Sequence, residues 1–212
     1  MTAGAGNASA GGAPVKLWDD SGHQHDMFST RLLGFWLYML SDSLVFAALF
    51  AAYGVLSYPM SAAGGPTKMQ VVEPVYAYVE SVVFFASVLA YGLAMVDLKH
   101  DRPRALTLWM IAAFVLGAGF VGMEANELLG LAARGAGPQR SGFLSAFFTI
   151  LVVHGVHAVF GLLWMLVMMV QVAAKGLTPK VTYRLVNLKV FWLYQGVIWC
   201  LVYSFVYLWG AI

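Results

Sequence analysis

Long apolar runs separated by short polar segments dominate the pattern along this chain. There are five such runs, covering residues 32–57, 73–97, 105–133, 141–174 and 186–212. A helix needs about 20 apolar residues to cross ~30 Å of hydrocarbon, so each run is long enough. Backbone polar groups in lipid must bond within their own segment, which favours helices, and the short alternating segments of a β-barrel are not seen. The pattern predicts an all-α integral membrane protein with five transmembrane helices.

The residues before the first run have a different character. Residues 1–30 are rich in Ala, Gly and Ser and then become polar, with no basic stretch leading into an apolar core. We therefore expect a flexible cytoplasmic tail over residues 1–30, rather than a cleavable signal peptide, and a five-helix domain over residues 31–212. The short connections, such as residues 100–103 with Pro103, predict an antiparallel bundle.

Lys and Arg residues are distributed unevenly between the two ends of the predicted helices. Nine of the 12 lie in the tail, the second loop and the fourth loop: Lys16, Arg31, Lys99, Arg102, Arg104, Lys175, Lys180, Arg184 and Lys189. The other three, Lys68, Arg134 and Arg140, lie in the first and third loops. Because basic loops stay inside, this asymmetry predicts a cytoplasmic N-terminus and a periplasmic C-terminus.

Composition agrees with a membrane protein and excludes several other classes. Of the 212 residues, 61% are hydrophobic and 10% are charged, whereas soluble domains carry about 25% charged residues. The net charge of +2 is too small to indicate a nucleic-acid partner. A lone cysteine, Cys200, excludes an intramolecular disulfide.

Aromatic and small residues suggest how the helices are placed. Trp192, Tyr207 and Trp209 lie near the two ends of the last run, as interfacial anchors do. Small residues four apart, Ala113 with Gly117 and Ala118 with Gly122, favour close helix contact.

A few ionisable residues interrupt the apolar runs. They are Asp42, Glu80, Glu124, Glu127, His154 and His157. At ~1.5 Å per residue Asp42 lies roughly 16 Å from the inner edge, and the glutamates lie roughly 10–15 Å from the outer edge. Such groups are costly in lipid and normally face protein, so we expect them inside the bundle. The pairs three apart, Glu124 with Glu127 and His154 with His157, each share one helix face.

These residues allow several roles. A hydrogen-bonded polar core that joins helices is the simplest, with proton handling or lipid-headgroup contact as alternatives. Bis-His haem ligation needs imidazoles from opposite sides of the iron, but the two membrane histidines share one helix. A metal site built on Glu124, Glu127, His154 and His157 remains possible, although these pairs differ from the Glu-x-x-His device of di-iron bundles. We nevertheless expect no tightly bound metal in the chain, because its two membrane histidines share one face of one helix.

Four stretches carry a family resemblance. They are residues 34–42 (GFWLYMLSD), 119–124 (GFVGME), 137–148 (GPQRSGFLSAFF) and 154–157 (HGVH). From about residue 28 onward the chain resembles subunit III of the haem-copper terminal oxidases, most closely the five-helix form in bo-type ubiquinol oxidases. Asp42 occupies the place of a carbodiimide-reactive acidic residue of that family, and Glu127 and His157 match other family polar positions.

The resemblance implies an accessory, non-catalytic subunit of a proton-pumping quinol oxidase in a bacterial inner membrane. Haem and copper are then expected in subunit I, with subunit II and a small subunit IV as further partners. It also implies bound phospholipid and support of assembly and of sustained proton uptake by subunit I. The last helix departs from the family pattern, because residues 193–199 (LYQGVIW) lack its His-x-x-Asp. Gln195 and Tyr194 are candidates to replace those groups.

Three alternatives stay open at this point. The first is subunit III of a cytochrome c oxidase. The second is an independent transporter or proton channel, although no inverted repeat is visible. The third is a membrane metalloenzyme.

Overall fold

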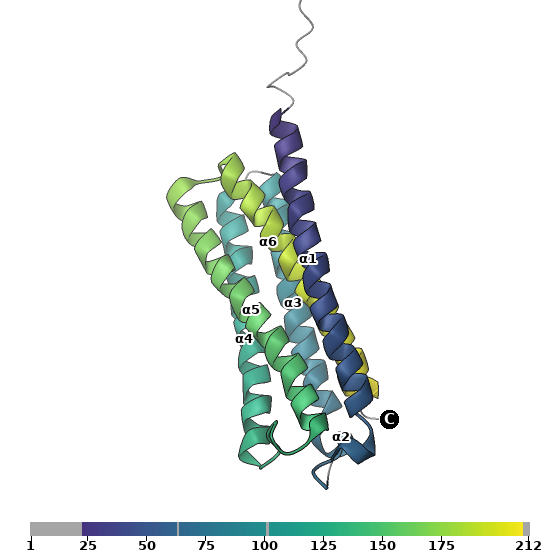
Figure 1. Cartoon of the computed structure of the whole chain (residues 1–212). Coiled ribbons are helices and arrows are strands. Elements are labelled where there is room, and N and C mark those ends of the chain that lie inside the picture. Colours follow the sequence, from purple (N-terminus) through teal and green to yellow (C-terminus); the bar gives the residue numbers. More distant parts are fainter. Residues whose placement is uncertain (1–22, 63, 101, 210–212) are drawn as a thin grey trace, which may run out of the picture.

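The computed structural model describes residues 23–62, 64–100 and 102–209, and these residues contain no strand. Five long helices run side by side (Figure 1). They are α1 (His23–Leu56), α3 (Pro74–Lys99), α4 (Pro103–Ala133), α5 (Gly142–Lys175) and α6 (Pro179–Val202), which continues as a π-helical segment, η2 (Tyr203–Leu208). Two short helices, η1 (Pro59–Ala62) and α2 (Lys68–Val71), connect α1 to α3. All five long helices are apolar and long enough to cross a membrane, so this is a multi-pass membrane protein.

The helix boundaries differ from the predicted ones at two places. α1 begins at His23 rather than at residue 32, inside the range assigned to the tail, and residues 1–22 lie outside the described residues. α6 begins at Pro179 rather than at residue 186. The apolar run marks only the part that suits lipid, whereas a helix starts where its first turn is capped. At α6 the hydroxyl of Thr178 accepts from the N–H of Val181, and Pro179 needs no N–H partner.

The long helices pack in a bundle, in which α5 and α6 each contact three others. α4 lies between α3 and α5, α6 contacts α3 and α5, and α1 packs against α5 and α6. Trp192 of α6 is almost fully buried, and its indole N–H donates to Ser87 Oγ of α3 at 3.2 Å. Two turns further along α6, the indole N–H of Trp199 donates to Ser81 Oγ at 2.9 Å. These two bonds join α6 to α3 through the centre of the molecule.

The expectation that Trp192 and Tyr207 are interfacial anchors is wrong. Both are buried, at 1% and 0% exposure, while Trp209 is 53% exposed. Trp192 can be buried because two glycines leave room for its ring. A β-carbon at Gly161 would lie 2.7 Å from the ring, and one at Gly117 would lie 2.8 Å from it. Gly117 therefore permits close contact as predicted, with an indole as its neighbour. A β-carbon at Gly122 would meet nothing within 4 Å.

α1 carries a broad exposed apolar face. Leu33, Leu37, Leu40 and Leu44 repeat at helical spacing and are 58–73% exposed. This face is suited to contact lipid or apolar partner helices rather than water.

Candidate functional site

Asp42 of α1 and His157 of α5 form one polar pair. Nε2 of His157 lies 3.2 Å from Oδ1 of Asp42, and Nδ1 lies 2.7 Å from the backbone oxygen of Val153. The side chains are 23% exposed for His157 and 12% for Asp42, so the pair reaches the surface of the bundle. Ser43 Oγ lies 3.3 Å from the Tyr194 hydroxyl, which links the same region of α1 to α6.

Glu124 of α4 and His154 of α5 form a second, fully internal pair. Oε1 of Glu124 lies 3.8 Å from Nδ1 of His154, which is longer than a hydrogen bond. The other ring nitrogen, Nε2, lies 3.3 Å from the backbone oxygen of Gln195 and donates to it, since a carbonyl can only accept. Gly155 makes room for the carboxyl group, because a β-carbon there would lie 2.9 Å from Glu124 Oε2.

The His154 ring is enclosed by aromatic side chains. Its centroid lies 5.7 Å from Phe84, 5.8 Å from Phe120 and 5.1 Å from Trp199. These rings come from α3, α4 and α6, so the histidine sits where four helices meet. These rings surround the imidazole. Its polar neighbours among the described residues are Glu124 and the Gln195 carbonyl.

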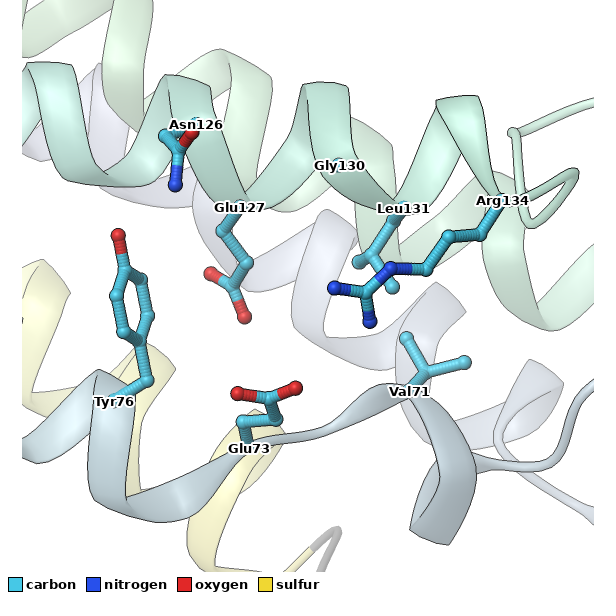
Figure 2. Close-up of a pocket in the computed structure, with 8 residues that line it drawn as sticks. All are labelled: Val71, Glu73, Tyr76, Asn126, Glu127, Gly130, Leu131 and Arg134. Carbon is cyan, nitrogen blue, oxygen red and sulfur yellow. The ribbon is translucent and has the colours of Figure 1, made fainter.

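The two remaining glutamates behave differently. Oε2 of Glu127 accepts from the Tyr207 hydroxyl at 2.7 Å, which joins α4 to the π-helical end of the last span. Glu80 of α3 is completely buried, and among the described residues neither of its oxygens has a hydrogen-bond partner. Glu127 also lines a cavity between the start of α3 and the end of α4 (Figure 2).

The six predicted residues therefore do not form one site. His154 and His157 are three apart, yet one faces α4 and α6 in the interior and the other faces α1 at the surface. Of the glutamates, Glu124 approaches a histidine, His154 of the neighbouring helix α5. Within the described residues no three His, Cys, Asp or Glu side chains form a group suited to a metal ion. The metalloenzyme alternative has no ligand set there.

The structure also identifies polar residues that sequence reasoning missed. Ser81 and Ser87 bind the two indoles, and Tyr207 binds Glu127. A signal was present in the spacing of Trp192 and Trp199, because seven residues place both on one helix face. Of the proposed substitutes on the last helix, Tyr194 contacts Ser43. Gln195 contributes its backbone oxygen, while its side-chain amide has no partner among the described residues.

Five helices able to span a membrane, joined by polar pairs, define a multi-pass membrane protein. Comparison with known proteins identifies its family. The model for cytochrome c oxidase subunit III matches residues 20–211, so the chain belongs to this family. It is similar to the cytochrome bo(3) ubiquinol oxidase subunit 3 of Pseudomonas aeruginosa, with 42% identity over 193 residues and 91% of each chain covered.

Other relatives carry related names. The Buchnera aphidicola subsp. Baizongia pistaciae cytochrome bo(3) ubiquinol oxidase subunit 3 is 35% identical, with 88% of this chain and 95% of the relative covered. The cytochrome c oxidase subunit 3 of Bacillus sp. (strain PS3) is 31% identical, with 86% of this chain and 87% of the relative covered.

Proposed function

We propose that this chain is the accessory, non-catalytic subunit III of a bo-type quinol oxidase in the aerobic respiratory chain. The observation that carries the proposal is the 42% identity over 91% of both chains to a subunit 3 of that complex. A subunit III of a cytochrome c oxidase is the second candidate, because a protein of that name is 31% identical. The higher identity favours the quinol oxidase.

In this function the redox chemistry belongs to partners. Haem and copper are held by subunit I, with subunit II and a small subunit IV in the same complex. The chain lies in the bacterial inner membrane as an antiparallel bundle, with its N-terminus in the cytoplasm and its C-terminus in the periplasm. The nine-to-three distribution of Lys and Arg supports this orientation.

The subunit supports assembly, binds phospholipid and sustains proton uptake by subunit I. Two features support contact with lipid or a partner: the exposed leucine face of α1 and the Asp42–His157 pair that reaches the surface beside it. Glu80, Glu124 and His154 instead lie in the interior, where they join helices or remain unpaired. They are suited to a structural role inside the bundle.

Purification of the tagged chain from its native membrane tests the proposal. Haem-containing subunits should co-purify and give reduced-minus-oxidised haem spectra in fixed proportion to the chain. A chain that purifies without haem proteins and takes up ions in vesicles would support a transporter instead. Iron or copper bound in stoichiometric amount to the separated chain would support a metalloenzyme.

A further inference from the structure

Side chains of opposite charge line one cavity between the start of α3 and the end of α4. The cavity, of about 200 Å³, is lined by Glu73, Tyr76, Asn126, Glu127 and Arg134 among others. In Figure 2 the carboxyl groups of Glu73 and Glu127 and the guanidinium of Arg134 extend into the same space from α4 and from the start of α3. The cavity thus combines an acidic side with a basic one.

These charges do not neutralise one another. Among the described residues no ion pair joins Arg134 to Glu73 or Glu127. Oε1 of Glu127 is buried and has no hydrogen-bond partner there, although Oε2 is held by Tyr207. The Tyr76 hydroxyl is already used, since it donates to the backbone oxygen of Met123 at 3.2 Å. Arg134 and Glu73 are both exposed, so one cation and one carboxyl group are open to a ligand, and the Glu127 carboxyl group lies behind them.

A neighbouring cavity extends the basic side. It has a volume of about 530 Å³, shares Val71, Leu131 and Arg134 with the first, and adds Arg140. The side chain of Arg140 packs against the Gly65 turn, where a β-carbon would lie 3.3 Å from its Cγ. Arg134 thus lies between Arg140 on one side and the carboxyl groups of Glu73 and Glu127 on the other. Guanidinium groups suit phosphate, and carboxylates suit a primary ammonium.

The surroundings indicate that the ligand is a lipid. The cavities lie where the membrane-spanning parts of α3 and α4 end, beside Val75 and Leu129, which are 77% and 70% exposed. Asn126 lines the first cavity, and the same exposed face of α4 continues through Gly122, Gly119 and Val115. Two glycines leave this face bare, so an acyl chain below the headgroup can lie close to the helix.

We propose that this double cavity binds the headgroup of a phospholipid that carries a primary ammonium, of the phosphatidylethanolamine type. The phosphate lies at Arg134 and Arg140, and the ammonium lies at the exposed carboxyl group of Glu73, in front of Glu127. The proposal deepens, and rests on, the lipid-binding part of the proposed function.

Native mass spectrometry of the oxidase complex containing this chain tests the site. The delipidated complex is titrated with phosphatidylethanolamine, phosphatidylglycerol and phosphatidylcholine that have identical acyl chains. We expect tighter binding of phosphatidylethanolamine than of the other two. Arg134→Gln should weaken it on the order of tenfold, because charge-assisted hydrogen bonds are lost. Arg134→Lys should restore part of that loss.

The carboxyl side has its own signature. Glu73→Gln should abolish the preference for phosphatidylethanolamine over phosphatidylglycerol, because only the ammonium is recognised there. Arg102→Gln and Asp97→Asn, at the opposite end of the same helices, are the matched controls and should change neither affinity.

Several results would overturn the proposal. One is equal binding of all three lipids by the unmodified complex, and another is unchanged binding by Arg134→Gln and Glu73→Gln. Displacement of the lipid by soluble phosphoethanolamine at equal concentration would show a site for a free zwitterion instead. Haem content of each preparation separates this test from that of the proposed function. A haem-containing complex without lipid preference removes only the site, and a chain without haem partners removes the subunit assignment.

Discussion

His157 Nε2 lies 3.2 Å from Asp42 Oδ1, while the same ring places Nδ1 2.7 Å from the Val153 carbonyl. Since a carbonyl oxygen only accepts, Nδ1 carries a hydrogen and donates. Nε2 then either accepts from a protonated Asp42 or donates to its carboxylate. In both forms the pair shares one proton, and it holds α1 against α5, next to the contact of Ser43 with Tyr194 of α6.

Asp42 should react with a hydrophobic carbodiimide and resist a hydrophilic one. Its carboxyl group is 12% exposed on an apolar surface, and Oδ2 has no hydrogen-bond partner among the described residues. Peptide mapping after labelling is the measurement. Glu80 serves as an internal control because it is fully buried. Labelling of Glu80 or Glu127 that spares Asp42 would contradict this expectation.

Gly161→Ala should destabilise the bundle by about 1–3 kcal/mol, as overpacking of a filled core does. The added carbon would lie 2.7 Å from the Trp192 ring and 2.9 Å from Phe191, and both rings are buried in the core. Thermal unfolding of the purified complex, followed by loss of this subunit, measures the effect. Gly122→Ala is the control and should be nearly neutral, since its β-carbon meets nothing within 4 Å. Equal effects of the two changes would show that Trp192 is not packed as described.

Ser87→Ala should cost about 1–3 kcal/mol, because it leaves the buried indole N–H of Trp192 without a partner. Ser204→Ala is a suitable control, since that hydroxyl is exposed and bonds only to Cys200 of its own helix. Combining Ser87→Ala with Trp192→Phe should cost less than the sum of the single changes, because the unpaired donor is then gone. Strict additivity in subunit-retention measurements would exclude the hydrogen bond.

Glu124→Gln should leave the subunit folded and assembled, whereas Glu124→Leu should weaken its retention. Gln keeps a polar group toward His154 Nδ1, which lies 3.8 Å from the present carboxyl, while Leu removes it. Polar contacts between membrane helices contribute only about 0.6 kcal/mol on average, so the difference should be modest. Haem spectra of the assembled complex should not change with either variant. Altered spectra at full assembly would place this side chain near the redox centres and contradict the accessory role.

The number of long helices able to cross a membrane among the described residues could be predicted from the sequence alone, whereas the short helices η1 and α2 and the π-helical segment η2 could not. Five apolar runs, each longer than a bilayer requires, allow no other spanning structure, because backbone groups in lipid must bond within the segment. The sequence also identified the six ionisable residues that must find polar partners, because an ionisable group inside an apolar run is costly in lipid.

Only the tertiary structure decided which of those groups meet. His154 and His157 look equivalent along the chain, yet rotation by three residues turns one toward Glu124 inside and the other toward Asp42 at the surface. Likewise, the position of Trp192 along the chain suggests an interfacial anchor. Its ring is buried, because Gly117 of α4 and Gly161 of α5 leave room for it. Periodicity describes one helix at a time, whereas partners depend on how neighbouring helices are rotated and how closely they approach, and packing across several helices sets both.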